Sequence, residues 1–483
     1  MQDLDPVKIL FCTHCRPGYI PPPPLSPHQV VCGPLYSDHS EGGRVASLQA
    51  PDGRYDMAEI IARLPAEQRP DLLVVRADNV SPTLPRNLGA ARCRTVLIIG
   101  DTHHMQGRIQ YLVNYALAEP FDLIIFDYTR QHAHFFVEAG LDQVYWLPGI
   151  GVRRIPVPAN VKPDIPMSLV GQVGKWHPHR VALCNALIKA GLPLQVMQAP
   201  AEQARLLHAR SLVNLNCSLN GDLNLRVFEV LASGGLLLTD RLSPQAGLDL
   251  LLTNGEHLIT YKGIEDCIAK CHALLSGDPW AARVARAGKA AYEAALAPER
   301  VIKDFFALLE CGEVRPEFDL SRERRVLRGQ PVDLIELIRR VTLYEILQNI
   351  HLRQAFTRVL VTPAVDPRLA TDIVDLPRFS VMLDMSAEPE HVASRCDDFV
   401  EKGVEKQIEI IVKSDDLRER SFDLIIATSS DWRRHSFSDV LSRNAHAAVL
   451  ITDLGGSEGL IGEMGTVGLA RVAPEIPLFA RSA

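Results

Sequence analysis

Short runs of consecutive apolar residues recur along the first 150 residues, and segments with apolar residues every three or four positions separate them. A continuous apolar run is typical of a strand covered on both faces, whereas the wider spacing is typical of an amphipathic helix. The alternation predicts a doubly wound α/β domain over residues 1–150. Its expected strands are Lys8–Phe11, Asp71–Val75, Thr95–Ile99, Leu123–Phe126 and Gln143–Leu147, with helices at Met57–Leu64 and Ile109–Ala118.

Two further α/β units are predicted beyond a hinge. Residues 148–166 are rich in proline and glycine, which interrupt helices and strands and mark a domain boundary. The alternation resumes over residues 160–325 and again over residues 330–483, so the 483 residues predict three domains. The second domain is expected to hold strands Met167–Val170, Leu194–Met197, Val213–Asn216 and Leu236–Thr239 and helices His179–Ala190, Ala201–Ala209, Leu225–Ala232, Gly263–Leu275, Pro279–Ala295 and Val301–Leu309. The third is expected to hold helices Val332–Val341 and Tyr344–Phe356 and strands Arg358–Val361, Ser380–Leu383, Gln407–Val412, Phe422–Ala427 and Ala447–Thr452.

Composition narrows the class of protein. The chain is 47% hydrophobic and 23% charged, which is typical of a soluble globular protein, and no run approaches the roughly 20 apolar residues of a membrane span. A net charge of -7 argues against a nucleic-acid partner. The acidic N-terminus is unlike a signal peptide, and the dispersed cysteines fit free thiols, so we expect a cytoplasmic protein.

One cysteine motif invites a metal or redox interpretation. Cys12 and Cys15 are spaced as a C-x-x-C pair, with His14 between them. A tetrahedral zinc site needs four ligands, and no second pair with ligand spacing follows. The less specific interpretation, ordinary free thiols at the end of a strand, is therefore favoured, and no metal site is predicted.

Residues 211–240 carry the most informative pattern, which reads strand, polar loop, short helix, glycine stop and strand. Asn224 precedes the helix and is expected to cap it. Arg226 and Glu229 lie three residues apart, so both project from one face near the helix start. A cation and a carboxylate beside free backbone N–H groups suit a ligand that has both a phosphate and a sugar diol. An ordinary surface Arg–Glu pair has the same spacing and remains open on these residues alone.

The same segment resembles the donor-nucleotide segment of GT-B glycosyltransferases, in particular the CgeB-like and glycosyl transferases group 1 family. The resemblance rests on the string from Arg226 to Gly235, RVFEVLASGG, and on a following strand that ends at Thr239-Asp240. It implies an α/β fold of the GT-B type, in which two Rossmann-like domains face a cleft. It also implies that Glu229 binds the ribose hydroxyls of the donor. Many relatives carry a second glutamate where this chain has Gly221, which separates it from the E-x7-E subgroup.

A glycine-containing loop after the first strand of the second domain resembles the family's diphosphate-binding turn. It contains Gly174 and Lys175, with Arg180 on the helix behind, and backbone N–H groups and basic side chains there would approach the diphosphate. Solvated surface charge is the alternative for both basic residues. The sole D-x-D string, Asp3-Leu4-Asp5, stands at the start of the chain, so a metal-independent reaction is expected.

Candidates for the catalytic base follow the strand Thr95–Ile99. Asp101 and His103 stand at the carboxyl end of this expected central strand, where open α/β sheets bind ligands. A histidine accepts protons near neutral pH, and an adjacent aspartate fixes its tautomer. His104 and His132 are candidates for a neighbouring wall that contacts the acceptor.

The third domain resembles a Rossmann-type methyltransferase in the order and spacing of its strands, with Asp384 where such enzymes hold a ribose-binding acid. The loop after Arg358–Val361 is TPAVDP, without the glycine that a cofactor's close approach needs. The domain is therefore expected to lack S-adenosylmethionine and to serve assembly, as in a homo-oligomer, or acceptor recognition.

Taken with the resemblance, these features predict a glycosyltransferase that uses a nucleotide-diphosphate sugar as donor substrate and binds no cofactor. The family resemblance favours retention of anomeric configuration. The acceptor, whether a protein, a glycan or a small molecule, is not specified by the sequence. A sugar-nucleotide epimerase of the same fold and a non-catalytic nucleotide-sugar or assembly module are the alternatives.

Overall fold

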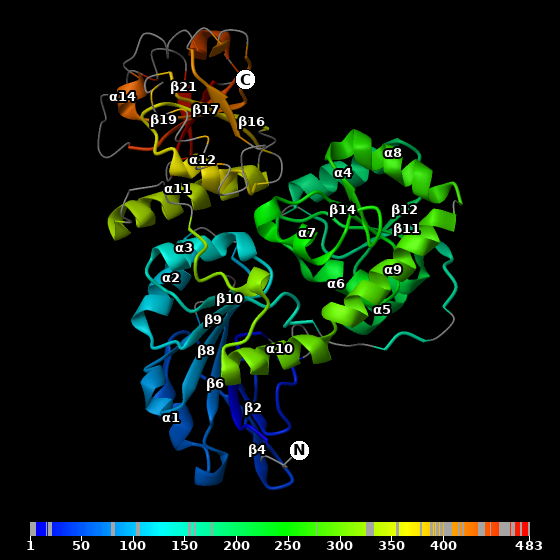
Figure 1. The fold of residues 1–483 in the computed structure, drawn as a ribbon, viewed down its shortest axis with the longest axis vertical. Helices are drawn as coiled ribbons and strands as arrows, with labels where there is room; N and C mark the ends of the chain where they lie inside the picture. The colour runs from blue at the N-terminus through cyan, green and yellow to red at the C-terminus, as the bar shows by residue number, and fades with distance from the viewer. Residues whose placement is uncertain are drawn as a thin grey trace. The chain divides into compact units, whose positions relative to one another are not determined.

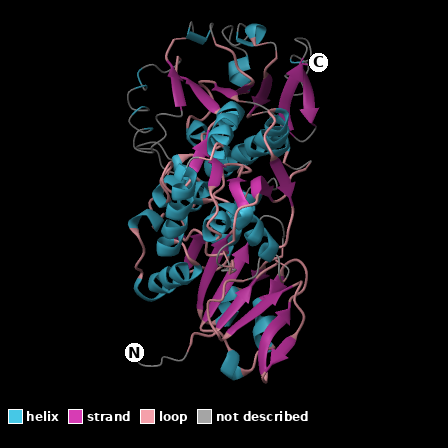
Figure 2. Ribbon diagram, turned by 90° about the vertical axis from the view of Figure 1, so that its right-hand side faces the viewer, coloured by secondary structure: helices cyan, strands magenta, loops and turns pink. Residues whose placement is uncertain are grey.

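The chain forms two compact units in a computed structural model, residues 1–324 and residues 325–483. The structure describes residues 6–15, 22–78, 83–102, 107–152, 156–158, 161–174, 177–277, 279–324, 333–353 and 357–376. Beyond these it describes residues 379–386, 408–413, 420–432, 440–444, 446–453, 469–473 and 476–481 and a few isolated positions. Figures 1 and 2 show sheets flanked by helices in both units, as the alternating apolar pattern predicts.

The first sheet has eight strands in the order β10-β9-β8-β6-β1-β2-β4-β3, and only β3 pairs antiparallel. Its strands are β1 (Ile9–Cys12), β2 (Gln29–Gly33), β3 (His39–Glu41), β4 (Arg44–Gln49), β6 (Leu72–Ala77), β8 (Arg94–Ile99), β9 (Leu123–Phe126) and β10 (Val144–Trp146). Helices α1 (Met57–Ala62), α2 (Arg108–Ala118) and α3 (Ala133–Glu138) alternate with these strands along the chain. Strands β1, β6 and β9 are buried along their whole length, which explains their uninterrupted apolar sequences.

The second sheet has five parallel strands in the order β12-β11-β13-β14-β15. They are β11 (Ile165–Val170), β12 (Leu194–Met197), β13 (Ser211–Leu215), β14 (Leu237–Asp240) and β15 (Ile259–Tyr261). The helices are α4 (Pro178–Lys189), α5 (Ala201–Arg210), α6 (Leu225–Ala232), α7 (Leu248–Leu251), α8 (Gly263–Leu275), α9 (Pro279–Ala295) and α10 (Pro298–Cys311). The predicted elements of this region are confirmed to within a few residues.

The chain returns to the first sheet after α9. Arg94 in β8 donates a hydrogen bond to the carbonyl of Leu309, and Leu320 donates to the carbonyl of Val144 in β10 at 3.0 Å. Phe318 packs edge-on against Trp146, with ring centroids 5.3 Å apart. Residues from both ends of unit 1 therefore build one compact body, with α10 beside the first sheet (Figure 1).

Unit 2 holds a seven-stranded sheet in the order β18-β17-β16-β19-β20-β22-β21, in which β22 is antiparallel to both neighbours. The strands are β16 (Arg358–Val361), β17 (Ser380–Asp384), β18 (Ile408–Ile411), β19 (Leu424–Ala427), β20 (Ala448–Ile451), β21 (Leu469–Ala473) and β22 (Ile476–Arg481), and helices α11 (Leu334–Arg353), α12 (Arg368–Ile373) and α14 (Ser429–Trp432) accompany them.

The prediction of two helices before β16 is wrong, because α11 runs unbroken through the expected gap. Thr342 lies in that gap, and its hydroxyl donates 2.8 Å to the carbonyl of Ile338, one turn back. A threonine that bonds its own helix in this way does not end it.

Candidate functional site

The second sheet reverses its strand order beside β11, because β12 lies on one side and β13 on the other. Ligands of open α/β sheets bind at the carboxyl ends of strands beside such a reversal. Arg226 joins these two ends: its Nε donates 2.7 Å to the carbonyl of Val170, and its Nη1 donates 2.6 Å to Oδ1 of Asn216. The arginine predicted to meet the donor diphosphate therefore lies at the switch point.

Gly171 lets Arg226 take this position. A Cβ at Gly171 would stand 2.0 Å from Nη2 of Arg226, and the residue has φ +148, which side-chain-bearing residues rarely adopt. Burial, with a smaller effect of Arg180, lowers the pKa of Arg226 to about 10. The guanidinium therefore keeps its positive charge at neutral pH.

Glu229 lies one turn along α6, on the same face as Arg226. Its side chain is 24% exposed, and Oε1 is 4.0 Å from Nε of Arg205 on α5. Burial raises the pKa of Glu229, while the positive charges of Arg205 and Arg226 act in the opposite direction. A partly accessible carboxylate in a basic surrounding can accept hydrogen bonds from a diol.

The other predicted donor residues differ in their surroundings. Arg180 is buried: its Nε donates 2.8 Å to the carbonyl of Cys217, and its Nη1 donates 3.2 Å to the carbonyl of Gln172. The Arg180 side chain therefore connects the loop after β11 to the loop after β13. The alternative of a solvated surface charge is wrong for Arg180. Gly174 lies in the loop after β11, whereas Lys175 falls outside the described residues.

Asn224 occupies the N-cap position of α6 but makes no capping hydrogen bond with its side chain, so that prediction is wrong. Both side-chain polar atoms of Asn224 are buried and have no hydrogen-bond partner among the described residues. Such an amide beside a helix N-terminus retains its full capacity to donate to and accept from a ligand.

Asp240, the last residue of the family-like string, shapes the loop after β13. It accepts the backbone N–H of Ser218 at 2.8 Å and also the Ser218 hydroxyl. Asp222 accepts the N–H of Leu219 at 2.8 Å in the same loop. These carboxylates satisfy backbone donors that a polar turn would otherwise leave buried and unpaired.

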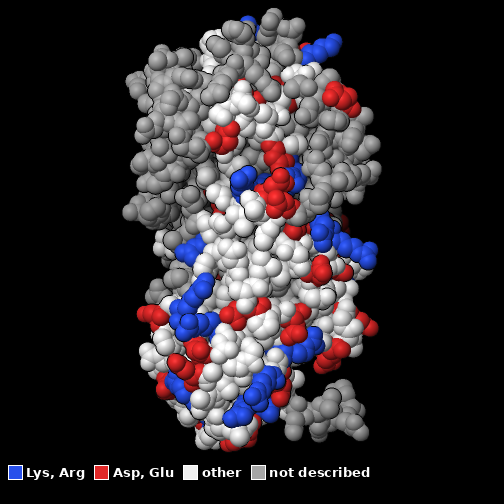
Figure 3. Space-filling view, turned by 90° about the vertical axis from the view of Figure 1, so that its left-hand side faces the viewer, with Lys and Arg blue, Asp and Glu red and all other residues white. Residues whose placement is uncertain are grey.

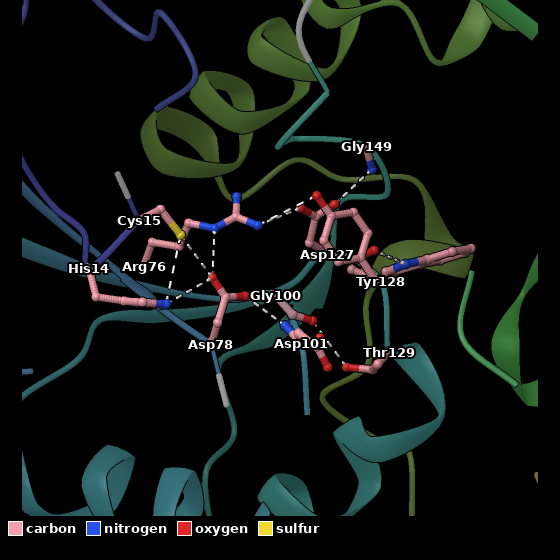
Figure 4. Close-up of polar contacts among 11 residues, drawn as sticks. His14, Cys15, Arg76, Asp78, Gly100, Asp101, Asp127, Tyr128, Thr129 and Gly149 are labelled. Atoms are coloured by element: carbon pink, nitrogen blue, oxygen red, sulfur yellow. Dashed lines mark hydrogen bonds and ion pairs between the residues drawn. The ribbon is translucent and has the colours of Figure 1, made fainter. Parts of the chain in front are cut away.

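In the first sheet, Asp101 follows β8 and is partly exposed. Its backbone N–H donates 2.7 Å to Oδ1 of Asp78, which follows the adjacent strand β6 (Figure 4). A Cβ at Gly100 would stand 1.8 Å from that same oxygen, so the Gly100-Asp101 pair is fitted to the Asp78 carboxylate. Asp101 thus stands at the carboxyl edge of the sheet, as predicted, on a fixed backbone.

Of the three predicted histidines, His132 alone lies among the described residues. His103 and His104 lie outside the described residues. His132 is 0% exposed, and its Nδ1 lies 2.6 Å from the hydroxyl of Thr102. It therefore supports the loop after β8 from within.

A buried charge cluster, Arg76 with Asp78 and Asp127, lies behind this edge and was not predicted from the sequence. Nε of Arg76 is 3.2 Å from Asp78, and Nη2 is 3.7 Å from Oδ2 of Asp127 (Figure 4). Arg76 also donates to the Tyr128 hydroxyl at 3.5 Å, and Asp127 accepts the N–H of Gly149 at 3.0 Å. The sequence signal that could have indicated this cluster is the aspartate that ends each of two apolar runs, LLVVRAD and LIIFD.

Burial raises the pKa of Asp127 to about 7, although Arg76, Tyr128 and the N–H of Gly149 oppose the shift and Asp78 adds to it. An unfolded aspartate has a pKa of about 3.9. We expect the contribution of Asp127 to the free energy of unfolding to be fully present below about pH 4 and lost as the pH rises to about 7, because the folded state holds the proton. Denaturant unfolding of the wild type and Asp127→Asn across this range measures it. A difference between the two that does not vary with pH would contradict the assignment.

The C-x-x-C pair is divided between two surroundings. Cys12 lies opposite Cys32 in the β1–β2 pairing, and its hydrogen bond with the Cys32 thiol raises the pKa of Cys12. Cys15 lies beyond the strand, where burial raises the pKa of its thiol to about 11. Its neighbours there are His14 and Asp78. The two cysteines of the motif therefore share no site.

A loop of the second sheet of unit 1 contacts a loop of the first sheet. Leu223 donates 3.1 Å to the carbonyl of Tyr128, and Nε2 of Gln131 donates 3.4 Å to the carbonyl of Gly221. The loop between β13 and α6 therefore contacts the segment that follows β9. This contact brings the polypeptide that carries Arg226 and Glu229 to the edge of the first sheet that carries Asp101.

The surface is mixed in charge. On the face drawn in Figure 3, positive and negative side chains of the described residues are interspersed, without a continuous basic area. Among the described helices, none combines the length and apolar character that a membrane span requires.

Comparison with known proteins finds a family match in the second lobe. The model of the glycosyl transferase-like family matches residues 156–307. A comparison with curated proteins gives no match. Among solved structures, the Anabaena protein HepE in complex with UDP and glucose is 13% identical, with a TM-score of 0.45 over 63% of this chain and 99% of that one. A glycosyltransferase from Rickettsia africae is 11% identical, with a TM-score of 0.45 over 63% of this chain and 98% of that one.

Sucrose-phosphate synthase from Thermosynechococcus elongatus is 11% identical, with a TM-score of 0.42 over 62% of this chain and 98% of that one. The family match spans the lobe that holds the Arg226–Glu229 helix, and a first doubly wound lobe precedes it. Residues 156–307, which include this helix, are therefore similar to the glycosyl transferase-like family.

Proposed function

We propose that the chain transfers a sugar from a nucleotide-diphosphate sugar to an acceptor, with the donor held at the switch point of the second sheet. The observation that carries the proposal is the pairing of Arg226 and Glu229 on one face of α6, at the ends of β11 and β13. Glu229 would accept hydrogen bonds from the ribose hydroxyls. Arg226 and the backbone of the Gly171–Gly174 loop would carry the negative charge of the diphosphate.

Leaving-group stabilisation in this arrangement would need no metal ion on the diphosphate, because a buried guanidinium and the N-terminal end of α6 would supply the positive potential. Asn224, whose amide is unbonded among the described residues, would orient the donor beside them. The family resemblance favours retention of anomeric configuration. Added Mg²⁺ or Mn²⁺ should leave the donor Kd unchanged.

Glu229→Ala is expected to weaken donor-nucleotide binding by about 1–3 kcal/mol, the scale for losing hydrogen bonds to a charged group. Calorimetric titration with UDP and the other nucleoside diphosphates measures this change. UDP is the first choice, because the HepE structure holds UDP and glucose. Glu265→Ala, at an exposed position on α8, is the matched control and should bind like the wild type.

Two outcomes would redirect the proposal. Wild-type protein without affinity for any nucleoside diphosphate or nucleotide sugar would favour a non-catalytic module. A changed sugar nucleotide after incubation with donor alone would favour an epimerase, which needs no acceptor. Product analysis with and without candidate protein, glycan and small-molecule acceptors separates these functions.

For unit 2 we propose an α/β domain that binds no S-adenosylmethionine and serves assembly or acceptor docking. The loop after β16 has no glycine, and its first residue, Thr362, donates 2.6 Å to the buried carboxylate of Asp431. Helix α12 follows that loop and is buried at every residue. These contacts support the proposal that this end of the sheet holds no S-adenosylmethionine.

Equilibrium dialysis of the full chain against labelled S-adenosylmethionine should show no binding at micromolar concentrations. A micromolar Kd that Asp384→Ala abolishes would overturn the proposal and would favour a bifunctional enzyme. The far-ultraviolet circular dichroism of that variant serves as the control for folding.

A further inference from the structure

Three potential metal ligands converge at the first sheet, outside the donor site. His14 and Cys15 follow β1, and Asp78 follows β6, the strand paired directly with β1. The order of this sheet reverses beside β1, so both segments leave the carboxyl edge at the reversal. Figure 4 shows the imidazole, the thiol and the carboxylate pointing toward one another.

The separations of the three atoms match a metal-centred triangle. Sγ of Cys15 lies 3.7 Å from Nε2 of His14 and 3.7 Å from Oδ2 of Asp78, and Nε2 lies 3.9 Å from that oxygen. The centre of a triangle with these sides is about 2.2 Å from each corner, and zinc binds nitrogen and oxygen at about 2.0–2.2 Å and sulfur at about 2.3 Å. An ion at the centre would need almost no movement of the ligands.

The hydrogen bonds from Cys15 to His14 and Asp78 are long, at 3.7 Å each, and Nε of Arg76 also donates 3.2 Å to Oδ2 of Asp78. The 3.9 Å between His14 and Asp78 exceeds a nitrogen–oxygen hydrogen bond. Nδ1 of His14 is buried and has no hydrogen-bond partner among the described residues, and the whole side chain is 6% exposed. The ring therefore makes no hydrogen bond at Nδ1 to the described residues, and Nε2 is the nitrogen that faces the thiol and the carboxylate.

The surroundings also favour a cation. Oδ1 of Asp78 is held by the N–H of Asp101 at 2.7 Å, which orients Oδ2 toward His14 and Cys15. Hydrogen bonds of this kind fix the ligands of natural metal sites. Asp78 and Asp127 together face a single guanidinium, that of Arg76. A divalent ion that displaces the Cys15 thiol proton to solvent is balanced in charge by its two anionic ligands, the Cys15 thiolate and the Asp78 carboxylate.

We propose that Nε2 of His14, Sγ of Cys15 and Oδ2 of Asp78 bind a divalent zinc-class cation, with water as the fourth ligand. The mixed nitrogen, sulfur and oxygen set suits zinc better than magnesium or calcium, which prefer oxygen alone. The ion stands apart from the diphosphate and takes no part in leaving-group departure. It ties β1 to β6 and fixes Asp78, the carboxylate that holds the backbone of Asp101.

The test uses the full chain in which the two exposed cysteines, Cys311 and Cys396, are replaced by serine, so that adventitious thiol binding is removed. Zinc content is measured by plasma mass spectrometry, and Co²⁺ is then exchanged into the protein and its visible and near-ultraviolet absorption recorded. We expect about one equivalent of zinc per chain and a sulfur-to-cobalt charge-transfer band of a tetrahedral site.

Cys15→Ser should remove the charge-transfer band, and Asp78→Asn and His14→Gln should lower zinc affinity by at least about 100-fold, the upper end of the loss seen for outer-shell partners. Cys93→Ser, another thiol of the first lobe, is the control and should keep one equivalent. Circular dichroism establishes that each variant is folded. Wild-type protein that holds no zinc after dialysis against it, or a cobalt band that survives Cys15→Ser, overturns the proposal. These readouts are independent of donor binding and sugar transfer.

Discussion

Asp101→Asn is expected to slow sugar transfer by roughly 10²–10⁴-fold, the range for losing a general base, and to leave donor binding unchanged. The substitution removes a proton acceptor at the carboxyl edge of the first sheet. The backbone N–H of residue 101, which Asp78 holds at 2.7 Å, remains in place, so the loop should keep its position. Steady-state kcat and KM with a nucleotide sugar and its acceptor measure the effect, and calorimetry measures donor affinity.

The control for this experiment is Asp142→Asn in the same lobe, where the side chain is 74% exposed and precedes the start of β10. It should behave like the wild type. Wild-type turnover by Asp101→Asn would show that the base is another group. His103→Ala is then the next variant to assay, before His132, which lies in the interior.

Arg76→Met is expected to lower the free energy of unfolding by about 3–5 kcal/mol, the cost of removing one partner from a buried ion pair. The guanidinium is almost fully buried, and its loss leaves Asp78 and Asp127 facing each other without a counter-charge. The loss should be smaller at low pH, where Asp127 binds a proton. Denaturant unfolding at two pH values measures both effects.

A second substitution tests the cause. Asp127→Asn in the Arg76→Met background removes one of the uncompensated carboxylates and should restore part of the lost stability. Arg86→Met, at an exposed position of the same lobe, should have little effect. Equal loss in Arg76→Met and in the double variant would mean that packing, and not charge, sets the contribution of Arg76.

Local sequence predicted the elements well where each strand is buried on both faces. β6, β8 and β9 appear as continuous apolar runs, because parallel strands covered by helices have no solvent-facing positions. β3 and β4 were missed, because they lie at the edge of the first sheet with many half-exposed or exposed residues and so lack that run. β2 and the short, buried β15 were also missed. The two-helix prediction for α11 failed because the polar Thr342, which interrupts the apolar pattern, forms its hydrogen bond within the helix.

The sequence by itself determined that Arg226 and Glu229 share a helix face, because residues three apart in a helix always do. Tertiary structure alone decided that Arg76 meets Asp127 and that Cys15 meets Asp78 instead of Cys12. Cys15 and Asp78 are 63 positions apart. Such residues meet only because β1 and β6 are neighbours in the sheet. Apolar periodicity reports which residues are buried, but it carries no information on which strand lies beside which.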